Sequence, residues 1–270
     1  MKTLFMGAGS MAHALMKGSL AAEVLRQEKV YVTNRSNRQG LEEFVHEFGV
    51  NKVEHEASYD VVILAMKPKD FHGAVATIRP YLTTHTLVIS VLAGITIQHL
   101  SDKLAFNGAI VRAMPNTSAS MGKSATAVSF NRHLTHSQKE WTMKLFQSVG
   151  IAVEVEEKQL DLITALSGSG PAYIYFVAEL LEKAAVELGL QQELAKDLIS
   201  QTIAGASEML EKSGLNAQEL RRNVTSPGGT TEAGIAALEE YHVREAFLQC
   251  IYSAKTRSEN LGKEINTQSL

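Results

Sequence analysis

A glycine-rich turn near the start of the chain contains residues suited to binding phosphate. Residues 7–12 read Gly-Ala-Gly-Ser-Met-Ala and lie between an apolar run and a helical stretch. In such a turn the first glycine permits a tight bend, and the second lets the backbone approach a pyrophosphate. Ala12 supplies the small third residue that lets the helix pack on the strand. The phosphates would lie on the unpaired amides at the helix N-terminus. A glycine turn without a ligand is the alternative.

A basic loop follows the second apolar run. NAD enzymes usually have Asp or Glu here, which holds the ribose hydroxyls of the adenosine. This chain has Asn34, Arg35, Ser36, Asn37 and Arg38 instead. The two guanidiniums and the serine hydroxyl could bind a 2′-phosphate, because arginine pairs with phosphate through two hydrogen bonds. The loop therefore favours NADPH over NADH, and a solvated polar loop is the alternative.

Two further glycine-rich segments lie in the second half of the chain. Residues 167–173 read Ser-Gly-Ser-Gly-Pro-Ala-Tyr, and residues 226–231 read Ser-Pro-Gly-Gly-Thr-Thr. Each precedes a helical stretch. Free amides and the helix dipole at such a position favour a small carboxylate. Taken alone, each segment could equally be a capped helix start.

Other kinds of chemistry have little support. His133 and His136 lie in a polar loop without a third ligand, so we expect no metal site. A net charge of −3 gives no sign of a nucleic-acid or membrane partner. The single cysteine, Cys250, excludes a disulfide within one chain, so nothing indicates an oxidising compartment. The glycines at positions 7 and 9 interrupt the first apolar run, which argues against a signal peptide. We expect a cytoplasmic protein.

The first part of the chain alternates strand-like and helix-like segments. Near-continuous apolar runs, rich in β-branched residues, are typical of strands that are covered on both faces. They lie at residues 4–6, 30–34, 60–66, 86–92, 109–114, 125–130 and 151–155. Helical patterns separate many of them. This alternation predicts an α/β fold with a Rossmann-like, doubly wound, mostly parallel sheet over residues 1–157.

The rest of the chain, residues 158–270, shows only helical patterns. Several of these helices are apolar on more than one face, and a helix that is apolar all round is buried on all sides. A domain of this size has too small a core to hide them all. We therefore predict an all-helical domain that packs against a second copy of itself.

Taken together, the motifs make the sequence resemble the pyrroline-5-carboxylate reductase family along essentially its whole length. The matching segments are GAGSMA (residues 7–12), LAMKPKD (64–70), SVLAGI (90–95), RAMPNT (112–117), TALSGSGPAY (164–173) and VTSPGGTTEAG (224–234). The last two are more specific than any dinucleotide fingerprint. Ser118 and Met66 depart from the family pattern, which commonly has proline and valine there.

The resemblance implies a role for residues in both halves. Residues 65–68 would pass the nicotinamide side of the cofactor, and residues 93–94 and 114–116 would lie near its ring. The residues assigned to the cofactor are Gly7, Ala8, Gly9, Ser10, Met11, Ala12, Asn34, Arg35, Ser36, Arg38, Ala65, Met66, Lys67, Pro68, Ala93, Gly94, Pro115 and Asn116. Those assigned to the substrate are Ser226, Gly229, Thr230 and Thr231. The family also implies a homodimer of helical domains, or a ring of dimers.

The expected reaction is hydride transfer from NADPH, or from NADH at lower affinity, to the C=N bond of pyrroline-5-carboxylate, which gives proline. Such a reduction needs neither a metal nor a covalent nucleophile, because the cofactor carries the difficult step. Thr231 is the first choice for a hydroxyl that hydrogen-bonds the imine nitrogen and supports its protonation. Lys67 is the other candidate, although it could instead be a structural lysine that binds backbone carbonyls.

Two other functions remain open at this point. A keto-acid or β-hydroxy-acid reductase can have the same architecture, but it typically needs a lysine acid–base in its helical half. Lys183 and Lys196 lie there, and neither adjoins a glycine-rich loop. A non-catalytic NADP-binding protein would leave the loop at residues 226–231 without a role.

Overall fold

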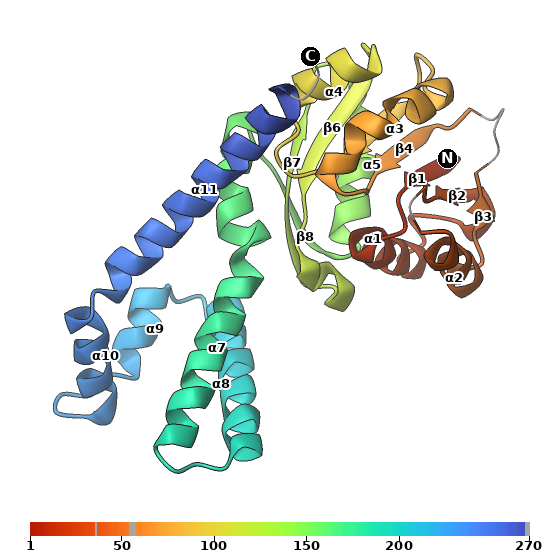
Figure 1. Ribbon diagram of the computed structural model, residues 1–270. Coiled ribbons are helices and arrows are strands. Elements are labelled where there is room, and N and C mark those ends of the chain that lie inside the picture. Colours follow the sequence, from red (N-terminus) through yellow and green to blue (C-terminus); the bar gives the residue numbers. More distant parts are fainter. Residues whose placement is uncertain (36, 54–57, 268–270) are drawn as a thin grey trace. The chain divides into compact units, whose positions relative to one another are not determined.

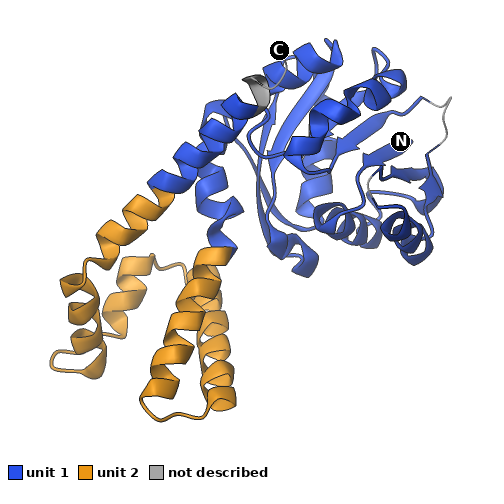
Figure 2. Ribbon diagram, in the orientation of Figure 1, with its two compact units in different colours: residues 1–171, 252–270 blue, residues 172–251 orange. Residues whose placement is uncertain are grey.

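The computed structural model describes residues 1–35, 37–53 and 58–267. They form two compact units (Figure 2). The sheet unit comprises residues 1–171 and 252–270, and the helical unit comprises residues 172–251. The division of function at residues 157 and 158 stays a prediction, because compactness and function need not divide a chain at the same residue.

The sheet unit contains one sheet of eight strands among the described residues (Figure 1). The strands are β1 (Thr3–Met6), β2 (Val30–Thr33), β3 (Asn51–Lys52), β4 (Val61–Leu64), β5 (Leu87–Ser90), β6 (Ala109–Met114), β7 (Ser124–Phe130) and β8 (Gly150–Glu154). Their order is β3-β2-β1-β4-β5-β6-β7-β8, and only the β6–β7 pair is antiparallel. The order reverses beside β1, so the topological switch point lies between β1 and β4.

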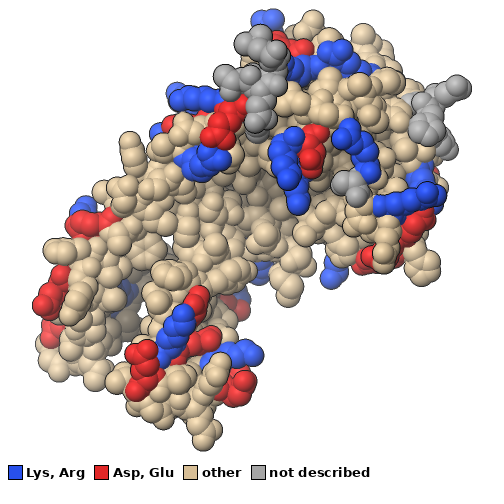
Figure 3. Space-filling model, in the orientation of Figure 1, with Lys and Arg blue, Asp and Glu red and all other residues tan. Residues whose placement is uncertain are grey.

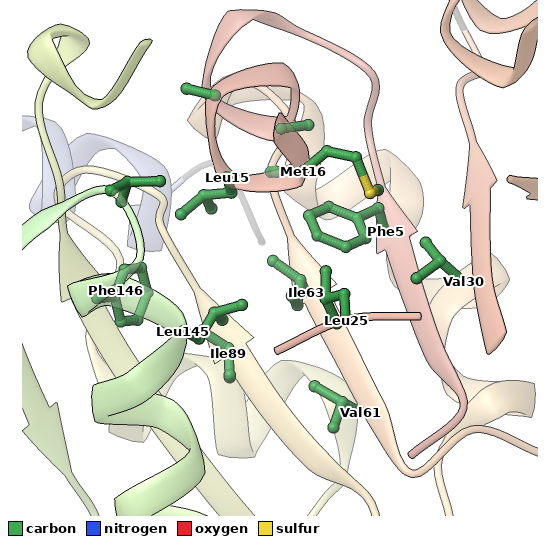
Figure 4. Close-up of a cluster of buried hydrophobic side chains, with 14 of the residues drawn as sticks. Phe5, Leu15, Met16, Leu25, Val30, Val61, Ile63, Ile89, Leu145 and Phe146 are labelled. Atoms are coloured by element: carbon green, nitrogen blue, oxygen red, sulfur yellow. The ribbon is translucent and has the colours of Figure 1, made fainter. Parts of the chain in front are cut away.

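Helices cover both faces of this sheet. They are α1 (Ser10–Ala21), α2 (Arg38–Phe48), α3 (Phe71–Ile78), α4 (Ile97–Leu104) and α5 (His136–Gln147). Alternate strand residues point to opposite faces. Phe5 and Ile63 pack with Leu15 of α1 and Phe146 of α5 on one face (Figure 4). Leu4, Met6, Val62 and Leu64 pack with residues of α3 and α4 on the other face.

Local sequence signals explain where several helices begin and end. Asn37 caps α2 by accepting a hydrogen bond from the Gly40 amide. Gly49 ends the same helix in the left-handed region, at φ 62°, which glycine adopts without strain. Thr135 and Gln138 form a capping box at the start of α5.

Helices make up the rest of the chain as described. They are α6 (Leu160–Ile163), α7 (Gly170–Glu187), α8 (Gln192–Lys212), α9 (Ala217–Asn223), α10 (Thr230–Glu240) and α11 (Val243–Thr267). A π-helical turn, Thr164–Gly168, precedes α7. Helix α11 begins in the helical unit and ends in the sheet unit without a break (Figure 2).

The predicted fold class is confirmed. The described chain has a Rossmann-like, mostly parallel sheet followed by an all-helical region. The short edge strand β3 was not predicted, because its two residues, Asn51 and Lys52, are both exposed and carry no apolar signal. The predicted strand 60–66 is shorter in the structure, where β4 covers Val61–Leu64. Its predicted ends, Ala65 and Met66, belong to the loop that follows.

Candidate active site

Five neighbouring strands end at the same edge of the sheet. The strands β2, β1, β4, β5 and β6 are mutually parallel, so their carboxyl ends lie in a row. Predicted cofactor residues follow these ends, with Gly7 directly after β1, Asn34 after β2, Ala65 after β4 and Pro115 after β6, and with Ala93 at the third position after β5. In open α/β sheets, ligands bind in the crevice outside such ends at the switch point.

Gly7 is required by a close approach of two backbone segments. Its φ is 120°, and a Cβ built at this position would lie 2.6 Å from the carbonyl oxygen of Ala65. Its amide also donates a 2.8 Å hydrogen bond to the Thr33 carbonyl. Gly7 therefore joins the ends of β2 and β4, and any side chain there would push them apart.

Gly9 lies in open space at the start of α1. In the part of the chain that the structure describes, a Cβ built on it would meet no other atom within 4 Å, and no side chain caps the helix at this residue. The first amides of α1 are therefore available to a phosphate. Ala12 is fully buried against the core, as the packing of α1 on the sheet requires. This arrangement fits the pyrophosphate of a dinucleotide.

The crevice at the switch point has a volume of about 220 Å³. Asn34 and Arg35 line it from the β2 side, and Gly7 and Met66 line it from the β1 and β4 ends. The Arg35 guanidinium donates a 2.8 Å hydrogen bond to the Gly73 carbonyl in α3. Arg35 is thus held beside the crevice by a bond that uses one of the five N–H groups of a guanidinium.

Two other residues of the predicted cofactor site, Ser10 and Arg38, are not among the described residues that line this crevice. Ser10 is the first residue of α1 and is exposed. Arg38 is the exposed first residue of α2. Ser36 lies outside the described residues.

Part of the crevice wall was not predicted from the sequence. Asp70, from the short helix after Lys67, brings a carboxylate to the crevice. Ala74 and Thr77 of α3 also line it, as do Met6 and Thr33 at the strand ends. The segment after β2 has no carboxylate, as the sequence indicates, but Asp70 enters from another strand end. Only the order of the strands in the sheet shows that Asp70 lies at the same crevice as the segment after β2.

Lys67 is exposed and follows Met66 at the end of the β4 loop. Its backbone carbonyl accepts the Asp70 amide at 2.9 Å. Within the described part of the chain, its ammonium makes no hydrogen bond to a backbone carbonyl. The alternative of a structural lysine therefore has no support here.

The ends of β5 and β6 carry the residues predicted to lie near the nicotinamide. Gly94 is buried with φ 76°, in the loop between β5 and α4. Asn116 is 8% exposed, and its side-chain amide donates a 3.0 Å hydrogen bond to the Ser167 carbonyl. Its side-chain oxygen accepts the Ser118 amide at 3.1 Å. Asn116 therefore ties the β6 loop to the π-helical turn before α7.

The predicted substrate loop lies in the helical unit. Gly229 is the N-cap of α10, and Thr230 and Thr231 are its first two residues. The Gly229 amide donates to the Ser226 carbonyl at 3.0 Å, so it is already satisfied. In the described structure, the amides of Thr230 and Thr231 have no protein acceptor. These two amides, with the helix dipole, are what the loop offers an anion.

A carboxylate in the same loop was not predicted. Glu232, at the third position of α10, accepts the Gly228 amide at 2.7 Å. Gly228 has φ 71°, so the loop depends on glycine for this geometry. Glu232 therefore fixes the loop and also places a negative charge close to the free amides. The sequence Thr230-Thr231-Glu232, with Glu at the third helical position, was the signal that could have predicted this carboxylate.

The remaining site types find no support among the described residues. No group of three or more His, Cys, Asp or Glu side chains in that part of the chain has the geometry to hold a metal ion. None of its helices combines the length and apolar character that crossing a bilayer requires. Acidic and basic side chains are interspersed on the face shown in Figure 3.

Two family models match separate parts of the chain. Residues 157–261 match the family described as pyrroline-5-carboxylate reductase dimerisation. Residues 2–94 match the family described as NADP oxidoreductase coenzyme F420-dependent.

Individual proteins are similar over nearly the whole chain. Pyrroline-5-carboxylate reductase 2 of Bacillus subtilis (strain 168) is 44% identical, covering 96% of this chain and 95% of that protein. A pyrroline-5-carboxylate reductase structure from Coxiella burnetii has a TM-score of 0.87 at 36% identity, covering 96% of this chain and 98% of the other. The Plasmodium falciparum pyrroline carboxylate reductase with NADP bound has a TM-score of 0.84 at 32% identity, covering 97% and 98%.

Proposed function

Because the chain belongs to the pyrroline-5-carboxylate reductase family, we propose that the crevice at the strand ends binds NADPH and that the loop before α10 binds the imine. The activity itself follows from the family. The protein is an NAD(P)-dependent oxidoreductase of proline biosynthesis that reduces pyrroline-5-carboxylate. Its relatives of that name match it over nearly their full length. The keto-acid reductase and the non-catalytic binding protein are therefore set aside.

The sheet unit would hold NADP through its backbone and its arginines. The free amides at the start of α1 suit the pyrophosphate, and Gly7 keeps the β1 turn close to β4. Arg35, held beside the crevice by Gly73, supports a preference for the 2′-phosphate of NADPH. NADH would bind with lower affinity, because it lacks that phosphate. When bound, the reduced nicotinamide supplies the hydride.

The helical unit would hold the substrate. The carboxylate of pyrroline-5-carboxylate would accept hydrogen bonds from the Thr230 and Thr231 amides, which have no acceptor in the described chain. Ser226 and Gly229 shape the loop, since the Ser226 carbonyl accepts the Gly229 amide. Glu232 keeps the loop closed through Gly228. Anchoring the ring in this way would limit its motion relative to the hydride donor.

The chemistry adds a hydride to the imine carbon and a proton to the imine nitrogen. The Thr231 hydroxyl, at the second position of α10, would hydrogen-bond the nitrogen and support its protonation. Lys67 is the second polar candidate, because its ammonium is exposed and makes no backbone bond in the described chain. Neither residue needs a metal for this role.

The dimerisation region indicates a homodimer. Assembly of dimers into a ring is part of the proposal, and so is a site completed by two subunits. A cytoplasmic location is also proposed, in keeping with the single cysteine. We keep the functional boundary at residues 157 and 158, where the matched dimerisation region begins.

One observation carries the proposal: the Thr230 and Thr231 amides at the start of α10 have no acceptor in the described chain, in a loop where the Gly228 and Gly229 amides are already bonded. The test is to incubate the purified chain with NADPH and pyrroline-5-carboxylate, and to follow NADPH absorbance and proline formation. A parallel reaction contains a small keto acid. We expect oxidation of NADPH only with the imine. Turnover of the keto acid alone would overturn the proposal.

A structure with NADP and proline bound tests the assignment of residues. We expect the proline carboxylate on the Thr230 and Thr231 amides. A carboxylate bound elsewhere, with those amides facing protein, would move the substrate site. The experiment is best done with the intact oligomer, because the helical unit depends on its partner.

A further inference from the structure

The last turns of α11 press directly on the loop that follows β5. A Cβ built on Gly262 would lie 2.5 Å from the Gly94 carbonyl oxygen. A Cβ built on Gly94 would lie 3.0 Å from the Gly262 amide nitrogen. Two backbone segments far apart in sequence are thus in contact, and neither position has room for a side chain.

A buried polar network fixes the same part of α11. Ser258 is 4% exposed, and its hydroxyl donates a 2.8 Å hydrogen bond to the Asp161 carboxylate. The same carboxylate oxygen accepts a 3.1 Å bond from Arg112 of β6, whose side chain is also 4% exposed. Ser258 and Gly262 are four residues apart and lie on one face of the helix. The helix is therefore held at two points, one turn apart.

The loop is held at its far end as well. The Glu157 carboxylate accepts the Ile97 amide at 2.7 Å, where α4 begins. It also lies 3.5 Å from the Arg112 guanidinium. Residues 91–96 are therefore bounded by an ion-pair network at one end and by Gly262 in the middle. This leaves the loop little freedom to move.

We propose that Gly262 and Ser258 are positioning residues for hydride transfer, which hold the Ala93–Gly94 turn in place from behind. The inference rests on the proposed function, in which this turn lies near the nicotinamide. Gly262 touches neither cofactor nor substrate in this proposal. It acts through the backbone of Gly94. Because Gly262 has no side chain, the Gly94 carbonyl can lie close to the helix.

The test compares the full-length wild-type chain with the Gly262→Ala variant. The added methyl group must displace the Gly94 carbonyl or the helix. Because misplacement by about 1 Å can cost a hundredfold in rate, we expect kcat to fall roughly ten- to a hundredfold. The KM for the imine and the NADPH dissociation constant should change much less. The deuterium isotope effect on kcat should rise, since hydride transfer becomes the slow step.

Asn260→Ala is the matched control, because Asn260 is exposed on the same turn of α11. We expect wild-type kinetics from it. Ser258→Ala is the milder second variant, which removes one bond to Asp161 and should lower kcat about threefold. Should Gly262→Ala fail to fold, Ser258→Ala decides the question by the same isotope effect.

Two failures can be told apart. A wild-type chain that consumes no NADPH with the imine overturns the proposed function. An active Gly262→Ala variant with wild-type kcat and isotope effect overturns only this inference. Loss of thermal stability without a change in the isotope effect would also overturn it, because that result describes packing alone. Hydrogen exchange of residues 91–96 gives a reading that needs no turnover, and we expect weaker protection in Gly262→Ala.

Discussion

In the sheet unit, every residue of β1, β4 and β5 is buried, whereas no residue of the 18-residue helix α7 is buried within the single chain. The three strands and the helix are all rich in apolar residues. Phe5 is fully buried, but Phe176 is 58% exposed. The sheet unit therefore closes its own core. The helical unit needs a second chain, because a large exposed apolar surface marks an interaction site.

The difference separates two kinds of stability. The sheet unit has helices on both faces, and both of its core clusters are made of buried side chains of one chain. Figure 4 shows part of one of these clusters. The helical unit has one fully buried hydrophobic residue, Ala195, among its described residues. We expect exposed apolar side chains such as Phe176 to become buried on association. Substitutions in the two units test this contrast between a core closed within one chain and a core that needs a second chain.

Phe176→Asp should have the largest effect. A charge placed on the exposed apolar face of α7 would be buried without a partner on association, which is strongly destabilising. We expect the mass measured by light scattering to fall to that of one chain, with activity lost more than about a hundredfold. Glu179→Gln on the same helix is the control, because it loses only an exposed ion pair with Lys183. A Phe176→Asp dimer would locate the interface elsewhere.

Thr231→Ala should slow turnover without weakening the cofactor. Removing the hydroxyl should lower kcat roughly ten- to a hundredfold, about 1.4–2.7 kcal/mol of transition-state stabilisation. The NADPH dissociation constant should stay the same, since Thr231 is assigned to the substrate and not to the cofactor. Steady-state kinetics and a fluorescence titration measure the two quantities. Unchanged turnover would remove Thr231 from the mechanism.

Arg35→Ala combined with Arg38→Ala, in the sheet unit, should weaken cofactor binding. Loss of charge-assisted bonds to the 2′-phosphate should weaken NADPH about tenfold. NADH should be affected less, because it has no phosphate there. Arg26→Ala with Lys29→Ala removes the same charge from the sheet unit outside the crevice, and should affect both cofactors equally. An equal loss of NADPH and NADH in the Arg35 and Arg38 variant would show that the loop does not recognise the phosphate.

His99 should make the closed core of the sheet unit sensitive to acid. It is 8% exposed in α4, and its Nε2 has no hydrogen-bond partner among the described residues. Burial lowers the pKa of His99, and the nearby His72 of α3 and Lys103 lower it further, whereas Asp102 opposes them. The unfolded chain therefore takes up a proton more readily than the folded one.

The free energy of unfolding should accordingly fall as the pH drops below about 6.5, the ordinary histidine value. The contribution of His99 to the free energy of unfolding is lost completely once the pH is below the pKa of His99 in the folded chain. Urea midpoints at pH 7.5 and at lower pH measure it, with His99→Leu as the variant that cannot titrate. We expect a smaller pH dependence in His99→Leu. Equal slopes would assign the acid sensitivity to other groups.

The sequence alone identified the types of most elements, because their signals are local. The apolar runs and the glycine at position 49 depend only on residues close in the chain. The motifs at residues 7–12 and 226–231 were recognisable for the same reason, and they identified the family. The helices that are apolar on more than one face also predicted a partner chain.

Contacts between distant segments could not be derived in this way. Asp70 entered the crevice, and Arg35 reached Gly73, 38 residues away, only because β2, β1 and β4 are neighbours. The bond from Ser258 to Asp161 spans 97 residues. A residue pattern specifies which face of a strand is buried, but not which strand lies beside it. That choice is made by the packing of the whole sheet, and it decided which side chains surround the site.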